Sequence, residues 1–290
     1  MSAATDLKRK LTEKPLTHII GAHNPLSARL AEQAGFDGIW ASGFELSAAY
    51  GVPDASLVSM TQHLEMARAI AEAVSVPVVA DIDTGYGNAI NVMHAVEKYE
   101  AAGVAAVVIE DKMFPKDTSL LAGGRQELVR IEEFQGKIEA AIAARRNPDF
   151  LIVARVEALI AGLGQDEARM RGEAYAAAGA DAILIHSKSK TPDEIVTFVN
   201  NWTSPAPLVL VPTAYPQLTE DDIVGLGKVK LVIYGNHAIR AAVTGMEKVL
   251  NQIRRDRGIQ NVDEAIVPVT RIFDLQGVPE MKEREKRYLR

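Results

Sequence analysis

The sequence predicts an α/β protein, a (β/α)8 TIM barrel with a C-terminal helical extension. Three observations lead to this expectation. Eight short runs rich in β-branched residues occur along the chain, longer alanine-rich stretches separate them, and polar side chains follow the ends of the runs. The runs cover residues 18–20, 38–40, 76–80, 105–109, 151–154, 182–185, 208–211 and 229–233.

These runs are apolar at consecutive positions, which is typical of parallel strands that helices cover on the outside. Between them, amphipathic patterns indicate helices, each closed by glycine or proline within a few residues. The clearest patterns cover residues 60–74, 90–102, 131–144 and 165–178. An open doubly wound sheet is the alternative, but it would not bring all eight strand ends around one point.

The 290 residues fit one barrel of about 250 residues, so we expect a single domain over 1–290. Residues from about 245 to 290 exceed what eight units require and are expected to form a helical tail. Residues 278–290 mix acidic and basic side chains, which favours a solvated helix. The alternative is that the tail packs on a partner subunit or is exchanged with it.

Composition argues against several classes of protein. The chain has no cysteine, which removes disulfides, thiolate nucleophiles, iron–sulfur clusters and cysteine-based zinc sites. With 32 basic and 38 acidic residues the net charge is -6, so we expect neither nucleic acid nor an anionic membrane as a partner. The first 15 residues lack the apolar core of a secretory signal, and no run of about 18 apolar residues occurs. A cytoplasmic protein is expected.

Four carboxylates follow three neighbouring predicted strands. Asp81 and Asp83 end the third strand, Glu110 ends the fourth, and Asp54 lies in the loop after the second. Carboxylates crowded at one barrel mouth repel one another unless a cation compensates them. Oxygen-only ligands favour Mg²⁺, with Mn²⁺ or Co²⁺ as alternatives, and some ligands would act through water. The alternative is that the two aspartates cap a loop and pair with lysine or arginine.

Other strand ends carry groups suited to an anionic substrate. Arg155 offers a planar cation and His186 a hydrogen-bond donor, although Arg155 could instead pair with Glu157. Ser42 and the Gly43 N–H could serve an oxyanion. Three further histidines are expected to be structural or at the surface: His18, His63 and His94.

A long excursion follows the fourth strand, over residues 110–125. Such excursions in compact domains are often lids or binding loops, and a solvated connection is the alternative. Here Lys116 would supply a cation and Thr118 a hydroxyl above the site, with Gly123 and Gly124 as a hinge.

Five segments resemble the phosphoenolpyruvate mutase and isocitrate lyase superfamily, and the resemblance covers nearly the whole chain. The segments are Trp40-Ala41-Ser42-Gly43, Asp81-Ile82-Asp83-Thr84-Gly85-Tyr86-Gly87, Ile109-Glu110-Asp111-Lys112, Ala154-Arg155-Val156-Glu157-Ala158 and Tyr234-Gly235-Asn236-His237. Lyase branches that break C–C bonds carry a Lys-Lys-Cys-Gly-His signature, which a chain without cysteine cannot have.

The loop at 110–116 resembles the branch that acts on the P–C bond of phosphonopyruvate. Mutases of that branch have an asparagine where this chain has Thr118, and the Asp117-Thr118-Ser119 variant is similar to the hydrolases. The resemblance implies hydrolysis of phosphonopyruvate to pyruvate and inorganic phosphate, through an enolate that Mg²⁺ stabilises. The alternatives are isomerisation between phosphonopyruvate and phosphoenolpyruvate, and decarboxylation or lysis of a related 2-oxo acid such as oxaloacetate. A catalytically silent binding scaffold is a further alternative.

The resemblance also implies a role for each candidate. Metal binding falls to Asp81 directly and to Asp54, Asp83 and Glu110 through water. Phosphoryl binding and catalysis fall to Arg155, His186, Lys116 and Thr118, with Thr118 holding the attacking water. Other substrate contacts fall to Trp40, Ser42, Gly43 and Ser119. Members of the superfamily commonly exchange the last barrel helix between subunits, so a homotetramer or homodimer is expected.

Overall fold

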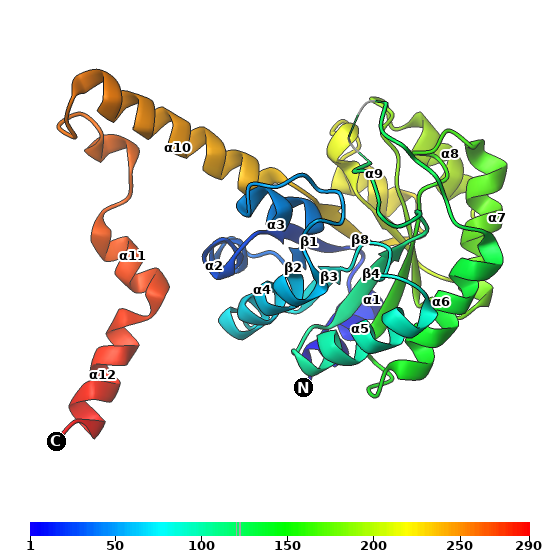
Figure 1. Cartoon of the computed structure of the whole chain (residues 1–290), viewed down its shortest axis with the longest axis horizontal. Coiled ribbons are helices and arrows are strands. Elements are labelled where there is room, and N and C mark those ends of the chain that lie inside the picture. Colours follow the sequence, from blue (N-terminus) through cyan, green and yellow to red (C-terminus); the bar gives the residue numbers. More distant parts are fainter. Residues whose placement is uncertain (120, 122) are drawn as a thin grey trace. The chain divides into compact units, whose positions relative to one another are not determined.

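The computed structural model describes residues 1–119, 121 and 123–290. Eight parallel strands close into a barrel in the order of the sequence, with β8 paired to β1 (Figure 1). The predicted barrel is therefore confirmed. The strands are β1 (Thr17–Ala22), β2 (Gly38–Ala41), β3 (Val78–Asp81), β4 (Ala106–Glu110), β5 (Leu151–Val156), β6 (Ala182–Ile185), β7 (Leu208–Leu210) and β8 (Val229–Tyr234).

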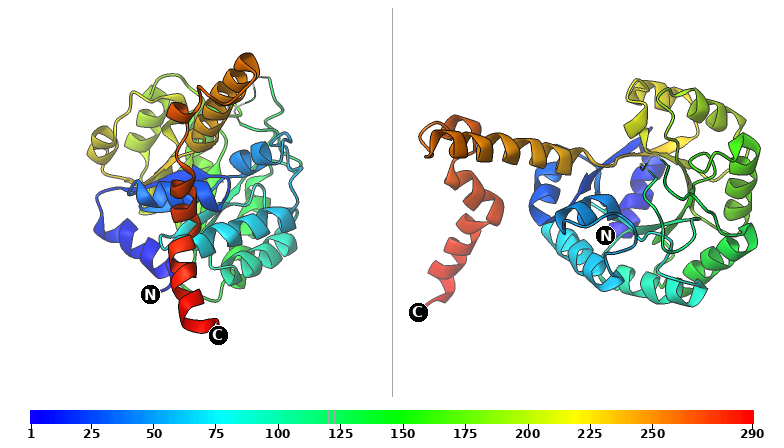
Figure 2. Two further views of the ribbon diagram at one scale, coloured as in Figure 1. Left: turned by 90° about the vertical axis from the view of Figure 1, so that its left-hand side faces the viewer. Right: turned by 45° about the horizontal axis from the view of Figure 1, so that its top comes forward.

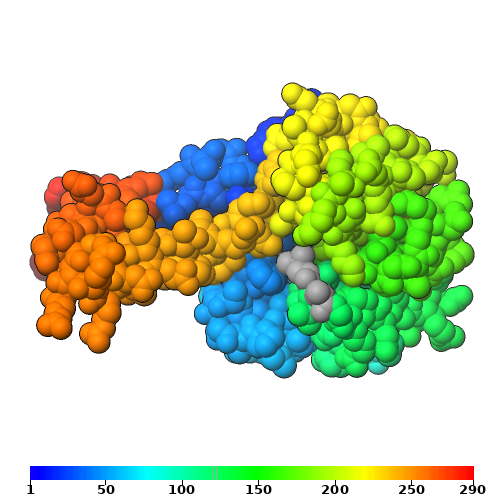
Figure 3. Space-filling model, turned by 90° about the horizontal axis from the view of Figure 1, so that it is seen from above, coloured from blue at the N-terminus to red at the C-terminus, as the bar shows by residue number. Residues whose placement is uncertain are grey.

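Helices surround this barrel, as the right-hand view of Figure 2 shows. They are α2 (Pro25–Gln33), α3 (Gly43–Ala49), α4 (Met60–Ala73), α5 (Ala89–Ala101), α6 (Ile131–Ala144), α7 (Gly164–Ala177), α8 (Asp193–Asn201) and α9 (Glu220–Gly225), with a 3-10 turn η1 (Pro212–Ala214). The surface of residues 1–237 follows the same circular order, from blue through green to yellow (Figure 3). The four predicted helices match α4, α5, α6 and α7 to within one residue at each end.

Most predicted strand bounds differ from the structure by one or two residues, and two of these differences have a clear physical reason. The third strand begins at Val78 and not at residue 76, because Pro77 has no N–H for the ladder. Its carbonyl instead accepts the N–H of Ile39. The seventh strand ends at Leu210, one residue early, because Val211 leads directly into η1.

Side chains alternate between the barrel interior and the helical layer. On β4, Ala106 and Val108 belong to the interior cluster, whereas Val107 and Ile109 pack against the helices. At the amino-terminal ends of the strands, the barrel interior is filled by Leu7, which is 1 % exposed and comes from α1 (Ala3–Glu13). Helix α1 was not predicted, because the first 15 residues were considered only as a possible signal peptide.

The same alternation directs polar side chains into the mouth of the barrel. Glu110 follows Val108 on the inner face of β4, and Arg155 follows Val153 on β5. The register pairs Glu110 with Arg155 and Asp81 with Val108. Acidic strand ends and a basic strand end thus become neighbours around one opening.

The chain divides into two compact units, Met1–His237 and Ala238–Arg290. The second contains most of α10 (His237–Asp256), a 3-10 turn η2 (Asp263–Ala265), α11 (Val269–Gln276) and α12 (Val278–Tyr288). A helix over 278–290 was predicted, and α12 confirms it. Among the described helices, none is both long and apolar enough to cross a membrane.

Candidate active site

A pocket that opens to solvent lies at the carboxyl ends of the strands, with about 560 Å³ of empty space including its mouth. The residues predicted from the sequence make up much of its lining: Trp40, Ser42, Asp54, Asp81, Lys116, Thr118, Ser119, Arg155 and His186. The other three, Gly43, Asp83 and Glu110, lie directly behind that lining. Gly43 packs against Asp81, Asp83 pairs with Lys116, and Glu110 lies beside Arg155. The twelve predicted residues therefore lie together in one site.

The carboxylates come from two strand ends and two connections. Asp81 and Glu110 are the last residues of β3 and β4, whereas Asp54 lies between α3 and α4. Asp83 has φ 51°, a left-handed conformation that is uncommon for a residue other than glycine. Gly43 packs against this group, since a Cβ there would lie 3.1 Å from Asp83 Oδ1 and 3.3 Å from Asp81 Oδ2.

The ammonium group of Lys116 lies among these carboxylates. Its Nζ is 2.7 Å from Asp83 Oδ1, 3.2 Å from Asp54 Oδ1 and 3.7 Å from Glu110 Oε1. Although burial opposes its charge, the surrounding carboxylates raise the pKa of Lys116 well above the ordinary lysine value. Lys116 is therefore a buried cation at the centre of the cluster.

One cation does not neutralise four carboxylates. Burial raises the pKa of Asp81, and burial together with Asp81 and other nearby carboxylates raises the pKa of Asp83 to about 7. Both carboxylate oxygens of Glu110 and Oδ1 of Asp83 are buried without a hydrogen-bond partner among the described residues. The contact of Lys116 with Asp83 is thus an ion pair without hydrogen-bond geometry.

This donor set fits a hard divalent cation. It supplies only oxygens, several of which lack a hydrogen-bond partner, and carries excess negative charge. Within the described part of the chain, no three carboxylate or imidazole groups are close enough to hold an ion directly. Direct binding by one carboxylate, with water between the ion and the others, is compatible with this spacing.

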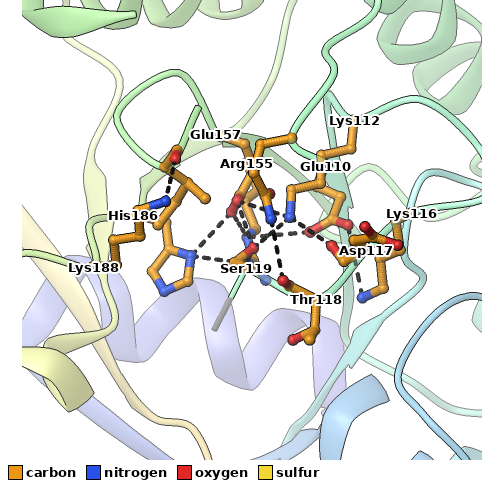
Figure 4. A network of polar contacts seen from close by, with 12 residues as sticks. Glu110, Lys112, Lys116, Asp117, Thr118, Ser119, Arg155, Glu157, His186 and Lys188 are labelled. Atoms are coloured by element: carbon orange, nitrogen blue, oxygen red, sulfur yellow. Dashed lines mark hydrogen bonds and ion pairs between the residues drawn. The ribbon is translucent and has the colours of Figure 1, made fainter. Parts of the chain in front are cut away.

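The opposite side of the pocket is built around Glu157, which is fully buried. Its Oε1 accepts a hydrogen bond from Arg155 Nε and lies 3.0 Å from His186 Nδ1 (Figure 4). Burial opposes ionisation of Glu157, but Arg155, His186 and Lys112 outweigh it and hold its pKa well below the ordinary value. The pairing of Arg155 with Glu157, left open above, is present, and Arg155 still lines the pocket.

His186 completes this side. Its Nδ1 also lies 2.9 Å from Arg155 Nη2, and the other ring nitrogen points away from Glu157 (Figure 4). Burial and the charge of Arg155 lower the pKa of His186. A neutral imidazole therefore stands beside a permanently charged guanidinium.

Ser119 joins the β4–α6 loop, residues 111–130, to this network. Its hydroxyl donates to Glu157 Oε2 (2.6 Å) and accepts from Lys112 Nζ (2.7 Å) and Arg155 Nη2 (3.1 Å). One donated and two accepted bonds use the full capacity of a hydroxyl. The loop is also closed at its base by an antiparallel bridge between Lys112 and Leu128.

Ser42 and Thr118 complete the predicted set. Ser42 caps the first turn of α3 and accepts the N–H of Glu45, which leaves its hydroxyl proton free to donate. Thr118 lines the pocket from the β4–α6 loop. Its carbonyl accepts from the Gln126 side chain, so the backbone of the loop is held at this point.

Sequence reasoning missed two groups of residues. Lys112 and Glu157 were not among the candidates, although Glu157 follows Arg155 by two positions and so shares its side of the strand. The pocket wall also includes Phe44, Thr213 and Asn236. Thr213 and Asn236 follow the last two strands, a position that places them at the mouth from sequence alone, but neither was given a role.

Comparison with known proteins agrees with this geometry. The family model described as phosphoenolpyruvate phosphomutase matches residues 7–254. A phosphonopyruvate hydrolase from Variovorax sp. (strain Pal2) is 64 % identical over 284 residues, covering 98 % of each chain. A phosphoenolpyruvate phosphomutase from Tetrahymena pyriformis is 45 % identical over 285 residues, covering 98 % of this chain and 95 % of the relative.

A solved structure gives the same result for the fold. The crystal structure of phosphonopyruvate hydrolase in complex with oxalate and Mg²⁺ has a TM-score of 0.95 and 62 % identity, and covers 100 % of both chains. A sequence match over most of the chain and a structural match over all of it agree with the five segments that carried the resemblance. The chain belongs to the phosphoenolpyruvate phosphomutase family.

Proposed function

We propose that the chain hydrolyses the P–C bond of phosphonopyruvate, giving pyruvate and inorganic phosphate. The observation that carries this proposal is the division of the pocket into an acidic side around Asp81 and a cationic side around Arg155. A substrate with a keto acid at one end and a phosphonate at the other matches that division. The Variovorax relative, named phosphonopyruvate hydrolase, supports the same assignment.

Asp81, Asp83, Asp54 and Glu110 would hold Mg²⁺, with Mn²⁺ or Co²⁺ as alternatives. In line with the resemblance, we assign direct ligation to Asp81 and ligation through water to the others, of which Asp54 also lines the pocket. When bound, Mg²⁺ would supply Lewis acidity that stabilises negative charge developing on the keto acid end of the substrate. The magnesium and oxalate in the related hydrolase structure support this metal and a ligand with adjacent oxygens.

The cationic side binds the phosphonate. Arg155, held by Glu157, and His186 contact its oxygens, and Lys116 adds positive charge from its place among the carboxylates. A loose transition state for phosphoryl transfer needs positioning and neutralisation more than covalent help. Ser42 and the Gly43 N–H donate to the developing enolate oxygen, while Trp40 and Ser119 border the substrate.

Water completes the reaction. Its oxygen forms a bond to phosphorus as the P–C bond breaks, and the bonding electron pair passes into the pyruvate enolate. A proton released from water balances the later protonation at carbon, so the products are pyruvate and phosphate. Thr118, which lines the pocket, holds this water by its hydroxyl and is small enough to leave room for it.

The test is a ³¹P NMR time course of the purified protein with phosphonopyruvate and Mg²⁺, repeated with EDTA. We expect an inorganic phosphate signal that grows with Mg²⁺ and disappears on chelation. Accumulation of phosphoenolpyruvate would make the protein a mutase, the alternative that the Tetrahymena relative favours. An unchanged spectrum would contradict both and direct attention to C–C bond substrates such as oxaloacetate.

Replacing Thr118 should separate hydrolysis from isomerisation. The longer amide in Thr118→Asn would displace the water and contact the phosphoryl group, so the rate of phosphate release should fall at least about tenfold. The same NMR assay measures it, and Thr191→Asn, at an exposed threonine, serves as the control. Steady phosphate release from Thr118→Asn would contradict the role of Thr118.

Lys116 should stabilise the metal-free protein. In Lys116→Met the carboxylates lose their buried partner, so in EDTA the free energy of unfolding should fall by about 3 kcal/mol. Mg²⁺ should then stabilise the variant more than the unmodified protein, because no ammonium competes with it. Urea unfolding measures both effects, with the exposed Lys190→Met as the control. Equal stability of Lys116→Met and unmodified protein in EDTA would contradict this balance of charge.

We also propose that the chain forms a homodimer or homotetramer through its last helices. On α10, apolar residues recur every three or four positions, at Ile239, Val243, Met246, Leu250 and Ile253. Exposed Val243, Met246 and Leu250 form an unusual apolar stripe for a solvated helix. Light scattering should give a multiple of 31.4 kDa, and a monomer mass at micromolar concentration would contradict the proposal.

A further inference from the structure

Two buried polar side chains and one partly buried one form a hydrogen-bonded chain behind the carboxylates. Tyr86 Oη lies 2.9 Å from Tyr99 Oη, and Tyr99 Oη lies 2.7 Å from His63 Nδ1. Tyr99 is fully buried and His63 is 4 % exposed. Polar groups in such surroundings are costly unless they are paired. Both hydroxyls and His63 Nδ1 find a partner here, whereas His63 Nε2 has none among the described residues.

This chain connects the two segments that carry Asp54 and Asp83. Tyr86 belongs to the connection between β3 and α5, three residues after Asp83, and Tyr99 lies on α5 itself. His63 lies in the first turn of α4, immediately after the connection that carries Asp54. The hydrogen bonds thus tie together the helices that follow both carboxylate segments.

The connection after β3 needs such support. Asp83 and Tyr86 have φ values of 51° and 60°, so two residues other than glycine occupy the left-handed region within four positions. Residues held in this region persist only where surrounding contacts determine them. At its inner end the connection is held by the Glu110 N–H, which donates to the Asp83 carbonyl at 2.8 Å. Tyr86 supplies a side-chain anchor at its outer end.

The charges that act on His63 show that it lies close to the acidic cluster. Burial, aided by the charge of Lys116 and opposed by that of Asp54, lowers the pKa of His63 to about 4. The ring is therefore neutral at pH 7, with one nitrogen able to accept and the other able to donate. A neutral ring can take part in the chain without adding a charge beside the carboxylates.

We propose that Tyr86, Tyr99 and His63 are positioning residues that hold Asp83 in the conformation needed to bind the metal. None of the three lines the pocket, so they act through the backbone between Asp83 and Tyr86. Outer partners of metal ligands commonly change metal affinity by about 10-fold to 100-fold when they are removed. The inference rests on the proposed function, because it requires Asp83 to serve a metal.

The test is calorimetric titration of the full-length protein with MgCl₂. Tyr99→Phe removes the central hydroxyl and leaves Tyr86 and His63 without their shared partner, so the dissociation constant for Mg²⁺ should rise at least about tenfold. At saturating Mg²⁺, kcat for phosphate release should stay within about threefold of the unmodified value, because no residue that contacts substrate changes. Tyr215→Phe is the matched control, since Tyr215 is buried and its hydroxyl has no hydrogen-bond partner among the described residues.

A second variant covers the case in which Tyr99→Phe does not fold. Tyr86→Phe frees the β3–α5 connection but keeps the bond between Tyr99 and His63, and it should raise the dissociation constant in the same direction. If the folded variants bind Mg²⁺ as tightly as the unmodified protein, the inference is wrong and the proposed metal site stands. If the unmodified protein binds no Mg²⁺, the metal site and the inference are both overturned.

Discussion

The structure depends on burying several carboxylates together at the mouth of a closed barrel. Asp81 and Glu110 point inward because strand alternation leaves no other direction, and Asp83 and Asp54 approach them from the adjoining connections. Their mutual repulsion in a partly dry pocket demands positive charge. Lys116 supplies it from one side and Arg155 from the other, 3.5 Å from Glu110. Ion pairs between Lys116 and these carboxylates hold the β4–α6 loop against the mouth of the barrel.

On the cationic side of the pocket, the charge of Arg155 is balanced by Glu157. Arg155 is shared between the acidic cluster and Glu157, and Glu157 also contacts His186 and the Ser119 hydroxyl. In the proposed function, a phosphonate would meet a guanidinium and a neutral imidazole that a buried anion already orients. The same anion anchors the loop through Ser119, so one carboxylate aligns Arg155 of β5, His186 after β6 and Ser119 of the loop, all of which are proposed to bind substrate.

Much of the fold and of the site could be predicted because both follow from periodicity. Apolar runs separated by amphipathic helices predict the barrel, and the first polar residue beyond each run lies at its mouth. The predicted residues Asp81, Glu110, Arg155 and His186 were found in this way. Glu157 was weighed only as a partner for Arg155. The packing of Leu7 from α1 into the barrel interior was not predicted. A short amphipathic helix near a terminus has the same sequence pattern whether it covers the end of a barrel or lies on the surface.

The sequence by itself determined the barrel, the order of its strands and which residue types meet at its mouth, because inward and outward positions alternate with a period of two. Only the tertiary structure decided how those charges pair. Lys116 lies among the carboxylates, and the Ser119 hydroxyl bonds to protein groups. Tyr86, Tyr99 and His63 come from separate elements and form hydrogen bonds with one another. Such contacts join residues that are distant in the chain, and their distances depend on packing that no local pattern encodes.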